Sequence, residues 1–162
     1  MKNKLSLLAL LFIICSLNLK ANQEVININK IIQNASITKK QVMVFLHMDY
    51  CPYCQRMKYK TFKDTNIKKF IDKHFKFVDI NIDKDGKVIF NGITYSKKDF
   101  SYSFDVDFFP TVLFFDKSYE ITYTVRGYRE IEKFNKILEY IQTKSYDKLD
   151  FFDYYKNRKD KE

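Results

Sequence analysis

The stretch Cys51-Pro52-Tyr53-Cys54 decides how this chain of 162 residues is interpreted. Two cysteines separated by two residues can close a small disulfide ring and open it again. The run VMVFL at residues 42–46, rich in β-formers, precedes the pair, and residues 55–60 after it have the composition of a helix. Cys51 is therefore predicted to lie where a strand ends and a helix begins. The partial positive charge and free N–H groups of a helix N-terminus stabilise a thiolate. This makes Cys51 the candidate nucleophile and Cys54 the resolving cysteine.

Two other uses of the pair are less well supported. A zinc site needs four ligands, and the chain offers this pair, His47 and His74, with no second CxxC. A purely structural disulfide is an alternative, but so small a ring restrains the unfolded chain weakly. Redox chemistry is the favoured interpretation, with no metal and no cofactor beyond the disulfide of Cys51 and Cys54.

The composition fits one domain with a core of its own. The chain has 16 Phe and 12 Tyr, whereas three glycines and two prolines are so few that each is expected to have a positional role. The formal net charge is +9, but the lysines are scattered among acids instead of forming a stripe. Because no recognisable nucleic-acid-binding module accompanies them, the charge indicates a solvated basic surface and no nucleic-acid partner.

Residues 1–21 have the pattern of a secretory signal peptide. Lys2 and Lys4 form the charged start, residues 5–17 the apolar core, and Ala21 is the small residue at the cleavage point. The apolar run is shorter than the ~20 residues of a membrane span, which leaves an uncleaved anchor as the second interpretation. Removal of the leader also removes Cys15, so that the mature chain keeps only the CxxC pair. We therefore expect a periplasmic protein that acts on the thiols of other proteins.

The rest of the chain is predicted to alternate helices and strands, as an α/β domain over residues 22–146 followed by a C-terminal helix and a frayed, charged tail at 147–162. In the first half, the pattern predicts a helix at 24–37, a strand at 42–47, a helix from Pro52 to about Lys60, a helix capped by Asp64 or Thr65 and a central strand at 75–82. The middle is predicted to hold a turn at 83–86, a hairpin around Asn91-Gly92 and a helix at 97–104 capped by Ser96. The last part is predicted to form strands at 111–115 and 120–126, a helix at 131–141 and a closing helix from Leu149 to Tyr155.

Three motifs together resemble the thioredoxin fold family. They are the strand that leads into CPYC, the run FPTVLFF at residues 109–115, and Gly127-Tyr128 before the last amphipathic helix. The resemblance covers roughly residues 24–142. Within the family, the segment from Thr61 to Phe75 is similar to periplasmic thioredoxin-like proteins of bacteria, which include sulfur-oxidation-associated thioredoxins and relatives of disulfide-interchange proteins. The resemblance implies a central mixed sheet flanked by helices, with residues 83–95 as an inserted hairpin before the proline strand.

The resemblance also implies a second half of the site. It makes Phe109-Pro110 a cis peptide whose loop faces the CxxC and pairs with a substrate segment. Without the resemblance, Pro110 would be interpreted as a simple strand start. Tyr50, Pro52 and Tyr53 are expected to contact the substrate or to tune the reduction potential.

One position departs from the family pattern. Cytoplasmic thioredoxins have a buried acid six residues before the first cysteine, where this chain has Phe45. The candidates for the proton acceptor of Cys54 are then Asp79, Asp49 and His47, and each is alternatively an ordinary surface or turn residue. A buried Asp79 would have a raised pKa and could act as a general base.

The function predicted from these residues is a thiol-disulfide oxidoreductase that exchanges disulfides with protein substrates. Tyr53 lacks the charge of an imidazole, which favours a reductant over a strong oxidant, and an exported reductant needs a membrane electron donor. The alternatives are a disulfide oxidase or isomerase, and a non-catalytic CxxC module that binds a metal or a partner. A fourth hypothesis makes residues 149–155 an aromatic docking helix, although a helix that covers the sheet is the simpler interpretation. The protein is expected to be a monomer.

Overall fold

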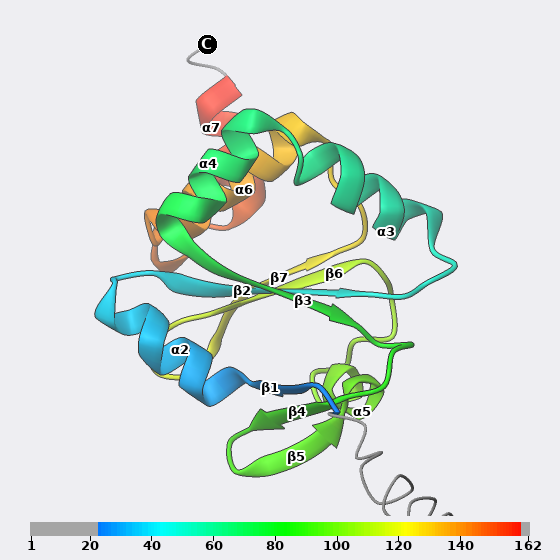
Figure 1. The fold of residues 1–162 in the computed structure, drawn as a ribbon. Helices are drawn as coiled ribbons and strands as arrows, with labels where there is room; N and C mark the ends of the chain where they lie inside the picture. The colour runs from blue at the N-terminus through cyan, green and yellow to red at the C-terminus, as the bar shows by residue number, and fades with distance from the viewer. Residues whose placement is uncertain (1–22, 160–162) are drawn as a thin grey trace, which may run out of the picture.

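The computed structural model describes residues 23–159 and has a mixed α/β fold, shown in Figure 1. The predicted leader, including Cys15, and the last three residues lie outside this range. The strands are β1 (Val25–Asn27), β2 (Gln41–His47), β3 (Phe75–Asn81), β4 (Lys87–Phe90), β5 (Ile93–Ser96), β6 (Thr111–Phe115) and β7 (Ile121–Arg126). The helices are α2 (Ile28–Ile37), α3 (Pro52–Arg56), the π-helical turn η1 (Met57–Thr61), α4 (Thr65–His74), α5 (Lys97–Tyr102), α6 (Ile131–Gln142), the 3-10 turn η2 (Ser145–Asp147) and α7 (Phe151–Lys159).

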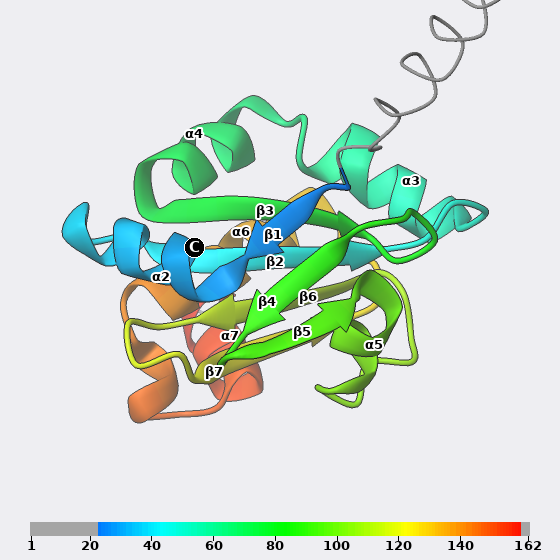
Figure 2. The same cartoon turned by 60° about the horizontal axis from the view of Figure 1, so that its bottom comes forward.

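The strands form two sheets. The larger sheet has the order β3-β2-β6-β7, in which β2 is parallel to β3 and antiparallel to β6. The smaller sheet has the order β1-β4-β5 and lies in front of the larger one in Figure 2. Helices α3, α4 and α6 cover one face of the larger sheet, and α2 with the smaller sheet covers the other (Figure 1). This arrangement confirms the predicted mixed sheet flanked by helices.

Strand β2 is buried on both faces and joins two hydrophobic cores. Met43 and Phe45 point into the core under α4 and α6, whereas Val42, Val44 and Leu46 point into the core under α2 and the smaller sheet. Because both faces are covered, the strand is a continuous apolar run without polar alternation. The predicted strand at 42–47 is confirmed, and its double burial fixes the direction in which it delivers the chain to Cys51.

Two predicted elements, the helix at 24–37 and the strand at 75–82, are partly wrong. The helix predicted at 24–37 begins only at Ile28, because Val25–Asn27 form β1 and the side chain of Asn27 caps the helix. Strand β1 pairs in parallel with β4, more than sixty residues later, and local periodicity carries no sign of such a distant pairing. The strand predicted at 75–82 exists as β3, but it is an edge strand and not a central one.

The structure confirms both the hairpin and the turn predicted in the inserted segment. Asn91 and Gly92, with φ of 49° and 78°, join β4 to β5 in an antiparallel pair, as expected for a tight two-residue turn. The turn at 83–86 is present, but it links β3 of one sheet to β4 of the other. Ser96 caps α5 by accepting a hydrogen bond from the Asp99 N–H, as predicted, and this helix ends at Tyr102.

An ion pair between a buried lysine and an exposed glutamate fastens the smaller sheet to the start of the domain. The Lys97 side chain is 5% exposed and its Nζ lies 2.5 Å from the Glu24 carboxylate. The Lys87 N–H also donates to the Glu24 carbonyl, at 2.8 Å. Gly86 has φ of +143°, and a Cβ there would lie 2.7 Å from Lys97 Cε. Only glycine therefore allows Lys97 to pass under this turn.

The last helix belongs to the same hydrophobic core as α6. It begins at Phe151, two residues after the predicted start, and continues through part of the tail that was expected to fray. The Tyr140 ring lies 5.5 Å from Phe151 and 5.0 Å from Tyr154. These contacts support the covering role over the docking role. Of the helices in the described range, none combines the length and apolar character needed to cross a membrane.

Candidate active site

The two cysteines occupy unequal positions at the start of α3. Cys51 is the N-cap residue, and its Sγ accepts a hydrogen bond from the Cys54 N–H at 3.1 Å. Cys51 and Cys54 form a disulfide with an S–S distance of 2.10 Å. Cys51 is partly exposed, whereas Cys54 is 1% exposed. An incoming group can therefore reach Cys51 but not Cys54, which is the arrangement that a nucleophile and a resolving cysteine require.

The local sequence explains why the cysteines are held at this point. Pro52 occupies the first helical position, where its missing N–H removes no helical hydrogen bond. The Cys51 N–H donates to the Asp49 carbonyl at 2.7 Å, and the Gln55 N–H donates to the Cys51 carbonyl at 3.0 Å. The turn after β2 is thus closed before the helix begins, and it presents the sulfur of Cys51 at the end of the sheet.

The loop before β6 lies directly beside Cys51. The Phe109–Pro110 peptide bond is cis, and the Phe109 carbonyl oxygen is 3.9 Å from Cys51 Sγ. Two hydrogen bonds fix the loop: Thr111 Oγ1 donates to the Phe108 carbonyl at 2.6 Å, and the Gly127 N–H donates to the Pro110 carbonyl at 2.7 Å. Residues 58 positions apart in the sequence therefore share one site.

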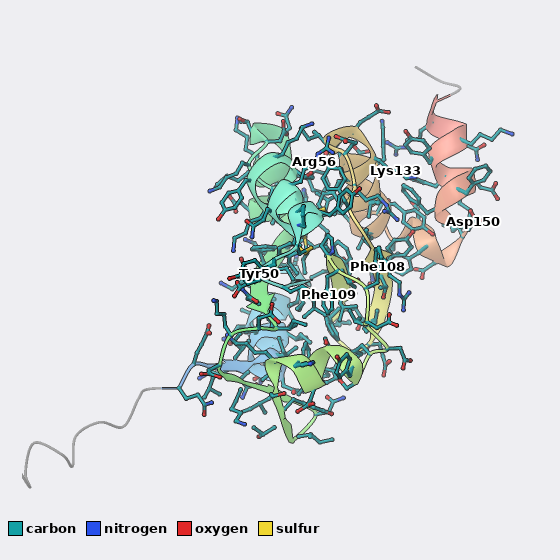
Figure 3. The ribbon with its side chains drawn as sticks, turned by 90° about the vertical axis from the view of Figure 1, so that its right-hand side faces the viewer. Tyr50, Arg56, Phe108, Phe109, Lys133 and Asp150 are labelled. Atoms are coloured by element: carbon teal, nitrogen blue, oxygen red, sulfur yellow. A yellow bond between two sulfur atoms is a disulfide. The ribbon has the colours of Figure 1, made fainter. Side chains whose placement is uncertain are left out.

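Four aromatic side chains come from the CPYC turn and from the loop beside Cys51, and are here called the aromatic rim: Tyr50, Tyr53, Phe108 and Phe109. The first three are 99%, 59% and 58% exposed. Figure 3 shows Tyr50, Phe108 and Phe109 on the same face of the molecule. Exposed apolar side chains gathered at one place mark an interaction surface more often than scattered ones do. Phe108 was missed from the sequence, although it directly precedes the Phe109-Pro110 pair.

Gly127 and Tyr128 pack against residues of the aromatic rim. The Tyr53 ring stacks on Tyr128 at 6.2 Å, and the Arg56 guanidinium lies 4.8 Å from the Tyr128 ring centre while it pairs with Glu130. Gly127 has φ of +83°, and a Cβ there would be 3.1 Å from Phe108 Cε1. Gly127 therefore satisfies two conditions, a left-handed backbone and the close approach of Phe108.

His47 and Asp79 interact with each other under the site. His47 is 4% exposed, its ring stacks on Phe45 at 4.9 Å, and its Nε2 lies 2.5 Å from Asp79 Oδ1. Asp79 also forms an ion pair with Lys58 at 2.8 Å. Partial burial alone would raise the pKa of Asp79, but the hydrogen bonds from His47 and Lys58 hold this pKa below its ordinary value. The expectation of a buried Asp79 with a raised pKa is therefore wrong.

Asp49 holds the loop together. Its Oδ1 accepts from the Asn81 side chain at 2.7 Å, and its Oδ2 pairs with Lys84 at 2.7 Å. Hydrogen bonds from Lys84 and Asn81 lower the pKa of Asp49. The Asp49 N–H in turn donates to the Asp83 carboxylate at 2.8 Å. These bonds tie the turn before Cys51 to the turn after β3, a structural task that leaves Asp49 ionised and poorly suited to accept a proton near neutral pH.

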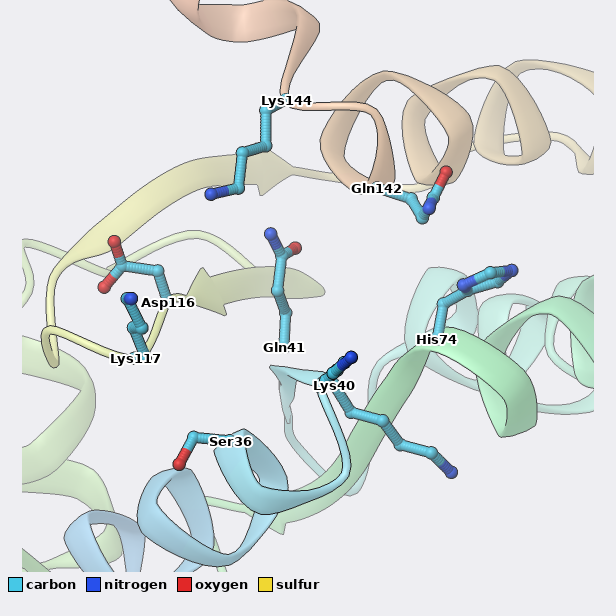
Figure 4. Close-up of a pocket in the computed structure, with 9 residues that line it drawn as sticks. Ser36, Lys40, Gln41, His74, Asp116, Lys117, Gln142 and Lys144 are labelled. Atoms are coloured by element: carbon cyan, nitrogen blue, oxygen red, sulfur yellow. The ribbon is translucent and has the colours of Figure 1, made fainter.

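A hollow of about 380 Å³ lies at the opposite end of the larger sheet and is here called the basic pocket (Figure 4). Gln41, the first residue of β2, lines it, whereas the cysteines follow the last residue of that strand. No cysteine lines it, so it is not the redox site. Within residues 23–159, no group of three or more His, Cys, Asp or Glu is placed to hold a metal ion. The lining residues are Ser36, Lys39, Lys40, Gln41, His74, Asp116, Lys117, Gln142 and Lys144.

The family profile of the thioredoxin-like domain matches residues 28–142. The chain belongs to the thioredoxin-like family. Its match includes the CPYC motif, the cis-proline loop and Gly127, which are the three motifs that carried the resemblance. No curated protein matches the sequence.

Solved structures of similar proteins agree with this assignment. A thioredoxin-fold protein from Helicobacter pylori is 25% identical, with a TM-score of 0.61 over 75% of this chain and 81% of that one. A thioredoxin from Thermus thermophilus is 20% identical, with a TM-score of 0.58 over 74% and 86%. The C-terminal domain of DsbD from Neisseria meningitidis is 15% identical, with a TM-score of 0.51 over 68% and 87%. The last two show a shared fold.

A thioredoxin-like domain with an accessible disulfide between Cys51 and Cys54 is a thiol-disulfide oxidoreductase. This confirms the class of enzyme predicted from the sequence. The assignment depends on the unequal exposure of the two sulfurs and on the loop beside Cys51, because a CxxC pair alone would equally suit a metal site.

Proposed function

We propose that this protein is an exported, periplasmic reductant of protein disulfides that works as a monomer and needs no cofactor besides its own dithiol. The observation that carries the proposal is the placement of Cys51 Sγ, partly exposed and 3.9 Å from the Phe109 carbonyl, within the aromatic rim. An open sulfur beside an ordered backbone edge suits a polypeptide substrate. The predicted leader supports the location, because disulfides persist outside the cytosol.

The exchange needs two thiol-disulfide steps that conserve atoms and electrons. In the reduced protein the Cys51 thiolate attacks one sulfur of the partner disulfide; a bond forms between Cys51 and that sulfur, and the other partner sulfur leaves as a thiolate. Cys54 loses its proton and attacks Cys51 Sγ, which restores the Cys51–Cys54 bond and releases the second partner thiolate. The partner gains two electrons and the protein loses two.

The substrate segment is expected to lie along the Phe109 loop. A strand-like pairing with the backbone at Phe109 would give affinity that does not depend on the substrate sequence. The aromatic rim would add selectivity for apolar side chains next to the target cysteine. Tyr50, which is 99% exposed in the turn before Cys51, and Phe108, which is 58% exposed in the loop itself, are the main candidates for that contact.

The residues between the cysteines support the proposed direction of electron flow. Neither Pro52 nor Tyr53 brings a positive charge to the Cys51 thiolate, so the reduced form is not strongly stabilised. We therefore expect a reduction potential nearer to that of thioredoxin, about −270 mV, than to that of a strong oxidant at about −120 mV. The oxidised protein must then be reduced again, and a membrane protein that carries electrons outward is the proposed donor.

A trapping experiment tests the function. In Cys54→Ser the resolving step is removed, so that Cys51 should hold substrates as mixed disulfides that dithiothreitol releases. The double variant Cys51→Ser with Cys54→Ser is the matched control and should hold none. Equilibration of the wild-type protein with glutathione measures the potential. A value near −120 mV would support the oxidase alternative, and stoichiometric zinc without any trapped protein would support the binding-module alternative.

A further inference from the structure

The outer edge of β3 is open along Lys76–Ile80. On its inner side, β3 pairs in register with β2 from Phe75 to Asn81, and no strand of the described residues pairs with its other side. Alternate residues of a strand direct their backbone N–H and C=O groups to opposite sides. Apart from the ladder with β2, no hydrogen bond within residues 23–159 reaches the backbone between Lys76 and Ile80. This edge therefore presents free donors and acceptors to solvent.

Hollows flank this edge on both faces of the sheet. The first, of about 310 Å³, lies on the side of η1 and α4 and has an apolar floor formed by Phe62, Ile71 and Phe77. The second, of about 450 Å³, lies on the side of β1 and α2 and is floored by Ile26, Ile31 and Val78. Successive side chains of a strand point to opposite faces. A strand laid beside β3 would thus place its side chains alternately toward the two hollows.

Lysines outnumber acidic residues around the edge, and Glu24, which also lines the second hollow, is paired with the buried Lys97. Lys58 is paired with Asp79, and Lys68 with Asp72. Three further lysines line or flank the same hollows without an acidic partner among the described residues. They are Lys63 in the first hollow and Lys30 and Lys76 in the second. A segment that binds here with alternating apolar side chains would therefore be favoured if its other residues were acidic.

We propose that the β3 edge is a docking site for an extended, acidic segment of a partner protein, which adds to the larger sheet as a fifth strand. The proposal goes beyond the redox function, since it places a second contact on a surface that contains neither cysteine. A second copy of this chain is a poorer occupant, because its own β3 edge carries the same excess of lysines and lacks the acidic residues that would complement this one. Like charges directly opposite each other weaken a strand pair.

A peptide of defined composition tests the proposal on the full chain with its disulfide formed. The probe is acetyl-Glu-Val-Glu-Ile-Glu-Val-Glu-amide, and the comparison peptide has lysine in place of each glutamate. Titration of the isotope-labelled protein, followed by amide chemical shifts, should show the acidic peptide shifting Lys76–Ile80 while the basic peptide does not. A third peptide, N-methylated at alternate residues, keeps the side chains but cannot complete the ladder and should bind at least about threefold more weakly.

Charge-reversal variants assign the binding to this edge. Lys63→Glu combined with Lys76→Glu should raise the Kd of the acidic peptide about three- to tenfold, since exposed pairs contribute up to about 1 kcal/mol each. Lys117→Glu combined with Lys148→Glu makes the same change of net charge elsewhere on the surface and should leave the Kd within about twofold. All four side chains are exposed, so that folding is preserved.

Several outcomes would overturn the proposal. If the amide chemical shifts changed away from β3, or if both double variants lost peptide affinity equally, the binding would be a general attraction between an acidic peptide and a basic protein. A dimer in sedimentation with protected β3 amides would assign the edge to a second copy. Protected β3 amides in the free monomer would assign it to the protein's own terminal residues. Unchanged binding by Cys51→Ser with Cys54→Ser is expected, which separates this proposal from the redox function.

Discussion

The two ends of the larger sheet differ in which helix termini they receive. At the end where β2 finishes, α3 begins, and Cys51 caps its first turn. At the other end α2, α4 and α6 finish: α2 ends three residues before β2, α4 ends directly before β3, and Gln142 of α6 lines the basic pocket. The first end carries the partial positive charge of a helix N-terminus and the second the partial negative charges of three C-termini.

This difference explains why the basic pocket is not the active site. Lysines at helix C-termini are stabilising by about 0.3–1 kcal/mol each, so Lys39 after α2 and Lys144 after α6 have a structural role without any ligand. At the other end the helix terminus stabilises an anion, which is the form that a reactive cysteine must adopt. The polarity of the helices therefore tells more about the site than the volume of a cavity does.

The largest expected effect is the loss of activity in Cys51→Ser. Without its nucleophilic sulfur the protein should reduce insulin disulfides no faster than dithiothreitol alone, because no mixed disulfide can form. Lys117→Ala at the basic pocket is the control and should keep the wild-type rate. A loss of activity in the control would break the comparison between the two ends.

Truncation of the aromatic rim is expected to have the second-largest effect. Tyr50→Ala combined with Phe108→Ala should lower kcat/KM for a protein disulfide about tenfold, in the range found when exposed aromatic contact residues are truncated. Phe152→Ala, which removes a ring that is 75% exposed on α7, should not change it. Steady-state assays with a protein and with a small disulfide separate the cases, since only the protein substrate should be affected.

Substitution of Gly127 tests the close packing at the redox end through its effect on the free energy of unfolding. Gly127→Ala should lower the free energy of unfolding by about 1–2 kcal/mol, because a left-handed backbone is unfavourable for alanine and the new Cβ would press on Phe108. Gly92→Ala is matched in φ, but a Cβ there has no neighbour within 4 Å. The excess loss in Gly127→Ala, measured by urea denaturation, reports the contact with Phe108. Equal losses would show that Phe108 moves aside freely.

Asp79 gives a pH dependence at the redox end. Its folded-state pKa lies below the ordinary value of 3.8, so its ionised form stabilises the fold above about pH 4, and this stabilisation is lost as the pH falls further. Asp79→Asn should cost less than about 1 kcal/mol at pH 7, since the group is partly exposed, and the difference from wild type should shrink toward pH 3. The pH profile of Cys54 alkylation in the reduced protein should stay unchanged. A shifted profile would make Asp79 the proton acceptor after all.

The smallest effect is expected from His74 at the basic pocket. Partial burial, with the nearby charges of Lys73 and Lys40, lowers the pKa of His74 below its ordinary value of 6.5. The neutral ring is thus favoured in the folded state, and stability falls as the pH drops below that value. His74→Gln should flatten this fall between pH 7 and pH 5.5 in urea denaturation. The rate at which His74→Gln reduces insulin should equal the wild-type rate across this pH range.

The sequence predicts the parts of the fold that depend on local pattern. The run at 42–47, the Asn91-Gly92 turn and the Ser96 cap all follow from adjacent residues, and the structure confirms them. Strand β1 and the edge position of β3 were not predicted, because each depends on which distant strand is its neighbour. The same distinction applies to the site: Cys51 and Cys54 come from a motif, whereas Phe108 enters through a loop that only the folded chain brings to Cys51.

The proton acceptors were predicted least well. His47, Asp79 and Asp49 were chosen for residue type and for closeness to Cys51 in sequence or sheet. The structure commits Asp79 to Lys58 and His47, and Asp49 to Asn81 and Lys84. These partners come from η1, from the ends of β2 and β3, and from the turn after β3. Their pKa effects cannot be derived before that packing is known.

The pairing of the buried Lys97 with Glu24 has a consequence for maturation. Cleavage after Ala21, as the leader pattern predicts, leaves two residues between the new N-terminus and Glu24. A cut only three residues further along would remove the carboxylate that neutralises Lys97. The buried ammonium beneath the Gly86 turn would then have no partner, which strongly destabilises the fold. The contact between Glu24 and Lys97 therefore limits where the mature chain can begin: a chain that starts after Glu24 would lack the partner of Lys97 and hold the inserted hairpin less firmly.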